Sequence, residues 1–244
     1  VALSESGKEL YAYAEQMFEL EQKIRDRFGL TGKQSGSVLR IAASTIPSQY
    51  LLPDIMVQFR RECPEEQLKL FETDSEGVVE MIRSHKADVG FTGTVIEKGN
   101  CTYIPFYQDE LVILTPATEQ FKARKDADAA SWFPEEPVIL REEGSGTRKE
   151  ALRLLEQMGI DISALNVAAV MENQETIKRS VSSGMGISIL SGLAAREEIS
   201  SGRLLAFPLG ETGGKRNINM VFDAGYPSLP AAEKFIKTVK QIYL

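Results

Sequence analysis

The stretch VILREEGSGTR, from Val138 to Arg148, joins an apolar run to a loop of glycine and hydroxyl residues. The next segment, Lys149 to Met158, contains good helix formers and is followed by Gly159, which predicts a helix that closes there. A strand that ends in a small loop at a helix amino terminus exposes backbone NH groups, and such groups can hold a small anion. The alternative is a capping box, in which Thr147 and Glu150 satisfy the donors of the helix itself. The residues alone leave both interpretations open.

Strand and helix patterns alternate on both sides of this stretch, which predicts an α/β fold with parallel strands. A first βαβαβ unit takes Val38–Ala43, Leu52–Arg61, Gln67–Glu72, Ser75–Ser84 and Ala87–Thr92. A second unit takes Val138–Arg141, Thr147–Met158, Asn166–Met171, Gln174–Ser183 and Gly186–Leu190. Between the units we expect two more strands, at Tyr103–Phe106 and Glu110–Thr115. After the second unit we expect a return connection at Leu204–Pro208, a strand at Asn217–Asp223 and a helix at Pro230–Ile242.

This order of elements predicts two Rossmann-like lobes joined by two crossover segments. Lobe I is expected to take residues 38–115 and 209–244, and lobe II residues 116–208. Two crossovers make a hinged cleft, and ligands of open α/β sheets bind beyond the carboxyl ends of the strands. The loops expected to converge there are Ser44–Pro47, Thr92–Thr94, Gly144–Thr147 and Glu172–Gln174.

The two units share one detail that supports a pair of similar lobes. Glu72-Thr73-Asp74 leads into the second helix of the first unit, and Met171-Glu172-Asn173 leads into the second helix of the second unit.

The segment from Leu3 to Phe28 has a long helix pattern without proline. A heptad spacing relates Leu3, Leu10, Met17 and Ile24, with Tyr13 and Leu20 three positions further on. Such spacing predicts a two-stranded seam between two copies of the chain. The alternative is a helix that lies on its own domain, and Gly7 and Glu21 beside the seam weaken the pairing. We therefore expect a linker helix at residues 1–30 and a flexible connector at residues 31–37, which is rich in glycine and polar residues.

Composition excludes several classes of function. The chain has 244 residues and a formal net charge of −7, which argues against a surface that binds duplex DNA. Its cysteines, Cys63 and Cys101, are too few for a disulfide scaffold or a zinc site of four cysteines, so a reducing, cytoplasmic setting fits best. The chain has no membrane-spanning run and no export signal, so we expect no membrane partner. One histidine, His85, and the lack of metal-ligand spacing favour a non-enzyme without metal or cofactor.

Five motifs in this order and spacing resemble the LysR-type transcriptional regulators of bacteria, over about residues 38–244. They are LRIAAS at Leu39–Ser44, LP at Leu52–Pro53 with Phe59 and Pro64, ADVGF at Ala87–Phe91, LVILTP at Leu111–Pro116 and VSSGMGISIL at Val181–Leu190. The resemblance implies an effector-binding domain with a fold similar to type 2 periplasmic binding proteins. It also implies that Leu3–Phe28 is the linker helix of a homodimer, which assembles into a tetramer in many full-length members. In addition, it implies that DNA is contacted only by a winged helix-turn-helix domain that this chain lacks.

The resemblance places a small-molecule effector between the lobes. The residues that match family pockets are Ser44, Thr45 and Ile46 in the first loop, Thr94 after the third strand, Ser145, Gly146 and Thr147 in lobe II, and Asn173. For Ser44 and Thr45 the alternative is local turn bonding ahead of a helix. The carboxylates Glu142 and Glu143 stand beside the lobe II loop, so a small monoanion or a zwitterionic amino acid derivative is as credible as sulfate.

Two functions compete on these grounds. The first is an effector sensor that controls DNA binding and transcription. The second is a solute-binding protein of a transport system for a small anion or an amino acid derivative, which uses a similar two-lobed fold. The predicted dimer helix and the missing export signal favour the sensor.

Overall fold

The computed structural model describes residues 38–97, 100–210, 213–226 and 228–244, together with residues 4, 6, 7, 10, 11, 13, 14, 17, 18, 20, 21 and 24. The predicted connector at residues 31–37 lies outside the described residues, and so do Leu3, Phe28 and other positions of the predicted linker helix. The described positions between residues 6 and 24 all have helical backbone conformation.

Strands and helices alternate along the chain, which confirms the predicted α/β class. The strands are β1 (Val38–Ala43), β2 (Gln67–Glu72), β3 (Val89–Thr92), β4 (Cys101–Pro116), β5 (Val138–Arg141), β6 (Val167–Met171), β7 (Ile187–Ser191), β8 (Leu204–Pro208) and β9 (Gly214–Asp223). The α-helices are α2 (Leu52–Glu62), α3 (Ser75–Arg83), α4 (Glu119–Ala123), α5 (Gly146–Gln157), α6 (Gln174–Ser182), α7 (Arg196–Ser200) and α8 (Pro230–Tyr243). A π-helical turn, η1 (Pro47–Leu51), precedes α2, and short 3-10 turns are η2 (Ala129–Ser131), η3 (Phe133–Glu135) and η4 (Ile162–Ala164).

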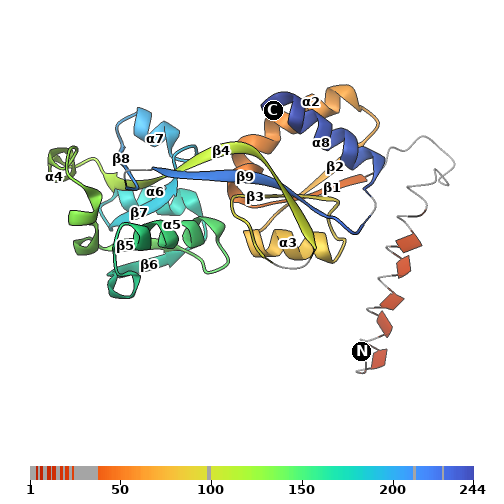
Figure 1. Ribbon diagram of the computed structural model, residues 1–244, viewed down its shortest axis with the longest axis horizontal. Helices are drawn as coiled ribbons and strands as arrows, with labels where there is room; N and C mark the ends of the chain where they lie inside the picture. The colour runs from red at the N-terminus through yellow and green to blue at the C-terminus, as the bar shows by residue number, and fades with distance from the viewer. Residues whose placement is uncertain are drawn as a thin grey trace.

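The strand order is β2-β1-β3-β9-β4-β7-β5-β6, and β8 pairs with β4 beside this path. The pairings of β1 with β2 and β3, and of β5 with β6 and β7, are parallel. The pairings that involve β4 and β9 are antiparallel. Figure 1 shows two groups of elements, one around β1–β3 with α2, α3 and α8 (lobe I) and one around β5–β8 with α4–α7 (lobe II), joined by β4 and β9. The residue limits proposed for the lobes stay a prediction, because β4 and β9 pair with strands of both groups.

The two strands expected at Tyr103–Phe106 and Glu110–Thr115 are instead one continuous strand, β4. Its register against β9 shifts between Pro105 and Tyr107, so Phe106 is left without a partner in the ladder and its side chain is buried. The expected return connection at Leu204–Pro208 is also a strand, β8. It pairs antiparallel with β4, with Leu205 opposite Thr115. Both differences arise because β4 supplies pairing partners that local sequence does not show.

Each lobe has its own aromatic core. In lobe I, the ring of Phe235 on α8 packs edge-on against Phe59 of α2 and Phe91 of β3, with centroid distances of 5.1 and 6.1 Å. In lobe II, the ring of Trp132 packs edge-on against Phe121 and Phe207, with centroid distances of 5.8 and 5.2 Å. The two hydrophobic cores are separate clusters, so the lobes are connected by the strands β4 and β9 and by the contacts at the junction.

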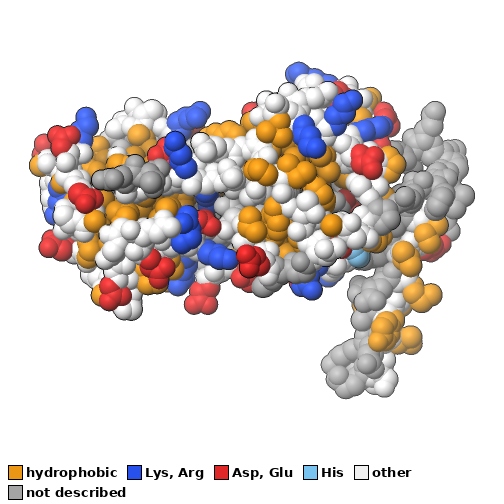
Figure 2. Space-filling model, in the orientation of Figure 1, with side chains coloured by type: hydrophobic (Ala, Val, Ile, Leu, Met, Phe, Trp, Pro, Cys, Tyr) orange, Lys and Arg blue, Asp and Glu red, His pale blue; other side chains and the backbone are white. Residues whose placement is uncertain are grey.

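The described part of the N-terminal segment carries exposed apolar side chains, which are visible in Figure 2. The exposed fraction is 70% for Leu10, 73% for Met17 and 45% for Ile24, the described members of the heptad series. These side chains are therefore not buried against the described residues of the same chain. None of the helices in the described ranges combines the length and apolar character that a membrane span requires.

Candidate functional site

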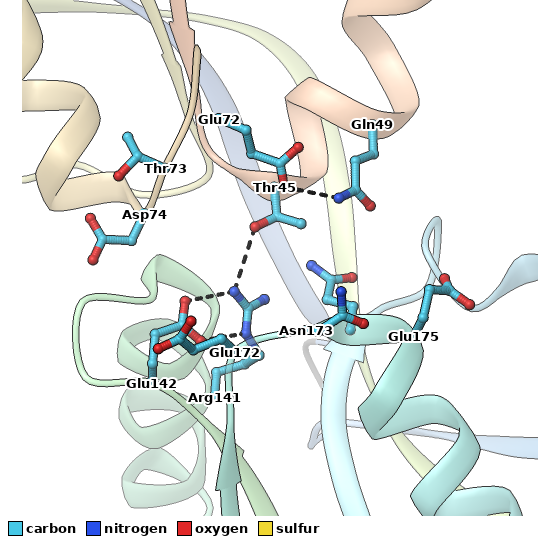
Figure 3. A pocket seen from close by; sticks show the side chains of 11 residues that line it. Thr45, Gln49, Glu72, Thr73, Asp74, Arg141, Glu142, Glu172, Asn173 and Glu175 are labelled. Carbon is cyan, nitrogen blue, oxygen red and sulfur yellow. Dashed lines mark hydrogen bonds and ion pairs between the residues drawn. The ribbon is translucent and has the colours of Figure 1, made fainter.

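The loops after the parallel strands meet at the junction of the lobes. The strands β1 and β2 run in the same direction, and so do β5 and β6, so that each pair ends at one edge of its lobe. A cavity of about 430 Å³ opens between these edges. Its lining residues are Thr45, Gln49, Glu72, Thr73 and Asp74 from lobe I, and Arg141, Glu142, Glu172, Asn173, Gln174 and Glu175 from lobe II. Figure 3 shows this junction cavity with the lobe I side chains facing those of lobe II.

One cationic side chain, Arg141, lines the junction cavity. It is buried, and its Nε and Nη2 atoms donate to the two carboxylate oxygens of Glu142, each at 2.7 Å. Its Nη2 also lies 3.5 Å from Thr45 Oγ1 across the junction, at the limit of a hydrogen bond (Figure 3). The bidentate pair with Glu142 neutralises the guanidinium.

On the lobe I side, the turn η1 holds a carboxylate at the cavity wall. Ser48 Oγ donates to Glu72 Oε2 at 3.0 Å, and Gln49 Nε2 donates to Glu72 Oε1 at 2.9 Å. Both donors are neutral, so neither of them supplies a positive charge opposite the Glu72 carboxylate.

On the lobe II side, the amino terminus of α6 faces the cavity. Asn173 is the N-cap residue, and its Oδ1 accepts from the backbone NH of Thr176 at 3.0 Å. The next residue, Gln174, is 2% exposed, and its Oε1 and Nε2 have no hydrogen-bond partner within the described ranges. A buried amide of this kind costs free energy unless a ligand or a water pairs with it. Gln174 therefore offers both a donor and an acceptor to an occupant of the cavity.

A buried lysine stands behind the cavity wall. Lys178 Nζ lies 2.6 Å from Glu175 Oε1 and 3.1 Å from Glu198 Oε1, and it donates to the carbonyl of Ala194 at 2.9 Å. Burial disfavours the charged form, but the hydrogen bonds to both glutamates outweigh it, so the pKa of Lys178 is raised above its ordinary value. Burial also raises the pKa of nearby Tyr50. Glu175 therefore already has a cationic partner, Lys178, which is not itself a lining residue of the cavity.

The hydroxyl side chains of the Gly-Ser-Gly-Thr loop do not form the predicted capping box. The N-cap of α5 is Ser145, whose Oγ accepts from the backbone NH of Arg148 at 3.3 Å, and not Thr147. Thr147 Oγ1 instead accepts from Arg216 Nη1 at 3.0 Å, and Glu150 accepts from Thr94 Oγ1 at 2.8 Å. The capping box predicted for Thr147 with Glu150 is therefore wrong, because Ser145 is the N-cap residue.

The loop is instead a close contact between the lobes. A Cβ atom at Gly146 would lie 2.5 Å from Ser75 Oγ and 2.7 Å from Thr94 Cγ2, and one at Gly144 would overlap the carboxylate of Asp74. The space left beside the loop is about 10 Å³, roughly enough for one water molecule. The glycines let the amino termini of α3 and α5 approach each other.

A buried ion pair supports this contact from the crossover strands. Arg216 of β9 donates through Nε to Asp109 Oδ2 of β4 at 2.9 Å, and Ser191 Oγ of β7 donates to Asp109 Oδ1 at 2.7 Å. The side chains of Asp109 and Arg216 are 1% and 4% exposed. Because Arg216 also reaches Thr147, the pair connects both crossovers to α5.

The eight residues predicted to bind the effector fall into three places. Thr45 and Asn173 line the junction cavity. The small space beside the glycine loop is lined by Ser44, Thr45, Ile46, Ser145, Gly146 and Thr147. Thr94 belongs to neither lining, and its side chain bridges to lobe II through Glu150.

Sequence reasoning missed most of the junction cavity. Gln49, Thr73, Asp74, Arg141 and Gln174 were not among the predicted contacts, although they line it. One available signal was the shared detail of the two units, because the Glu72–Asp74 and Met171–Asn173 segments lead into α3 and α6, whose N-cap residues line the cavity.

Two other kinds of group were candidates for chemistry, metal ligands and the single histidine. Within the described ranges, no group of three or more His, Cys, Asp and Glu residues could hold a metal ion. His85 stacks on Tyr226 with ring centroids 3.9 Å apart and lines a separate cavity in lobe I.

Comparison with known proteins identifies a family with this architecture. The model of the family described as LysR substrate binding domain matches residues 32–243. An uncharacterized HTH-type transcriptional regulator of Methanocaldococcus jannaschii, MJ0300, is 27% identical over 234 residues, which are 96% of this chain and 78% of that protein. The HTH-type transcriptional regulator CysL of Bacillus subtilis is 25% identical over 238 residues, which are 98% of this chain and 78% of that protein.

A solved structure has the same fold. The regulatory domain of CcmR from Synechocystis PCC6803, in complex with 2-PG, superposes with a TM-score of 0.76 and 23% sequence identity. The alignment covers 85% of this chain and 97% of that one.

Proposed function

Because this chain belongs to the family of LysR substrate-binding domains, we propose that its junction cavity binds a small polar effector and that occupancy changes the arrangement of the two lobes. The observation that carries the proposal is the origin of the lining, which comes from the strand ends of both lobes. An effector can shift the arrangement only through different affinities for its two states, and a ligand that touches both lobes has that property. The CcmR domain with bound 2-PG supports a small ligand for this fold.

The proposed contacts are Thr45, Gln49, Asn173 and Gln174, whose polar side chains line the cavity. Of the residues predicted from sequence, Thr45 and Asn173 remain in this set. The others, Ser44, Ile46, Thr94, Ser145, Gly146 and Thr147, are proposed to build the lobe contact beside it.

The partners of the domain follow the same reasoning. The exposed heptad residues support pairing of the N-terminal helix with a second copy of the chain in the cytoplasm. Occupancy of the cavity is proposed to control DNA binding, and thereby transcription, through a helix-turn-helix domain of the complete regulator. The relatives above are named as regulators, which favours this function over solute transport.

A thermal-shift screen tests the effector site. Sodium sulfate, sodium phosphate, shikimate, L-serine, L-cysteine and ethanolamine are the probes, and a ligand at 100 times its Kd stabilises the fold by about 2.7 kcal/mol. Thr45→Val is expected to weaken binding of any probe found in this way by about tenfold, since it removes a hydroxyl from the lining.

Thr118→Val is the matched control, because Thr118 is exposed and its side chain caps nothing. Equal calorimetric affinity of Thr45→Val and the unaltered chain would remove Thr45 from the site. A complete lack of binding across the panel would contradict the proposed function.

A further inference from the structure

The junction cavity has a surplus of negative charge. Its charged lining residues are five carboxylates, Glu72, Asp74, Glu142, Glu172 and Glu175, and one guanidinium, Arg141. Arg141 is bound in a bidentate pair with Glu142, and Glu175 shares Lys178 with Glu198.

The other three carboxylates of the lining have no cationic partner in the part of the chain that the structure describes. Glu72 accepts from Ser48 and Gln49, which are neutral, and Asp74 accepts from the backbone NH of Gly77 at 2.7 Å. Glu172 is exposed and has no ion pair within the described ranges. The charged groups that face an occupant are therefore negative on both lobes, so the cavity repels a purely anionic ligand and attracts a cationic group.

Gln174 adds a second and independent requirement. Its buried carboxamide offers Nε2 as a donor and Oε1 as an acceptor, and neither is used by the described residues. An occupant that satisfies both atoms must itself carry a donor and an acceptor a few ångströms apart. The first turn of α6, on which Gln174 lies, favours the negative end of such a group.

Resting on the proposed function, we propose that the effector is a small zwitterion with a protonated amine and a carboxylate, of the amino acid class, and that Gln174 is its specificity-determining contact. The ammonium group lies among Glu72, Asp74 and Glu172. The carboxylate lies at the amino terminus of α6, beside the Gln174 amide. A metal ion is not the cation, because the described residues contain no group of ligands that could hold one.

Pairs of probes that differ in the amine test the charge. Calorimetry on this chain compares L-serine with glycerate, L-alanine with lactate and L-cysteine with 3-mercaptopropionate, with sodium sulfate as the purely anionic probe. At least one amino acid is expected to bind about tenfold or more tightly than its partner without the amine, since a charged hydrogen bond is lost. The preference is expected to weaken at high salt.

Two variants test the assigned residues. Glu172→Gln is expected to weaken amino acid binding by about two- to fivefold, because it removes one exposed charge, and it would strengthen binding of an anion. Gln174→Ala is expected to weaken binding by about tenfold, whereas Gln157→Ala, an exposed position on α5, is expected to leave it unchanged. Because Glu172 is exposed, its variant remains informative if Gln174→Ala fails to fold.

The outcomes separate the inference from the function on which it rests. If sulfate or the amine-free acids bind more tightly and Glu172→Gln strengthens them, the zwitterion assignment is overturned while the cavity remains the effector site. If amino acids bind but Gln174→Ala has no effect, the specificity role is wrong. If no probe binds, the proposed function itself loses its support.

Discussion

Asp109→Asn is the substitution whose cost the structure defines most closely. Asp109 accepts from Arg216 Nε at 2.9 Å and from Ser191 Oγ at 2.7 Å, and the side chains of Asp109 and Arg216 are almost fully buried. The variant leaves a buried guanidinium opposite a neutral amide. Removing one member of a buried ion pair costs about 3–5 kcal/mol. At roughly 2–4 °C per kcal/mol for a domain of this size, Tm is expected to fall by about 6–20 °C.

Urea unfolding can be followed through Trp132, the single tryptophan, which is buried in lobe II. The double variant Asp109→Asn with Arg216→Met removes both charges and is expected to recover most of the lost stability, because the cost arises from an unpaired charge and not from the missing attraction. A loss of unfolding free energy below about 1 kcal/mol in Asp109→Asn would refute this reasoning. So would a double variant that loses as much unfolding free energy as the two single variants lose together.

Two further predictions concern the lobe contact and pH. Gly146→Ala puts a methyl group 2.5 Å from Ser75 Oγ and is expected to lower the free energy of unfolding by about 1–3 kcal/mol, whereas the methyl of Gly192→Ala has its nearest neighbour at 3.4 Å and is expected to be tolerated. Equal melting temperatures of the two variants would contradict the close contact of Gly146 with Ser75. The pKa of Lys178 is raised above its ordinary value of 10.5. Its contribution to the stability of the fold is therefore complete below pH 10.5 and is lost as pH rises through the pKa of the folded state. Between roughly pH 9 and 12, the melting temperature should therefore fall less steeply with pH for Lys178→Met than for the unaltered chain. Identical slopes for the two proteins would contradict this prediction.

Local sequence was sufficient where an element is bounded by clear signals. The strands β1, β2 and β5 begin and end at the predicted residues, because each is a short run of β-forming residues followed by turn residues. β4 was predicted as two strands because the polar run Tyr107–Glu110 breaks the apolar pattern. Its pairing with β9, about a hundred residues later in the chain, keeps it continuous.

The candidate site shows the same limit more sharply. Sequence reasoning found the correct strand ends, but it could not tell which loops touch the other lobe and which line an open cavity. Ser145 and Thr147 are both hydroxyl residues near a helix start. Their roles differ because Thr147 accepts a hydrogen bond from Arg216, which lies 69 positions later in the sequence. The buried amide of Gln174 has no local signature, because its isolation depends on packing around the junction.

The continuous pairing of β4 with β9 has a mechanical consequence for the signal that an effector sends. The ladder runs without interruption from Tyr107 to Leu111 on one strand and from Ile218 to Gly214 on the other, through the junction itself. The lobes are thus connected by a stiff two-stranded ribbon rather than by free loops. Any rotation of one lobe against the other must twist this ribbon, and a ribbon of two strands accepts twist more readily than bending in its own plane. In the proposed function, occupancy of the junction cavity would therefore twist this ribbon, whose uninterrupted ladder ends at Tyr107, next to Phe106, which has no partner in the ladder.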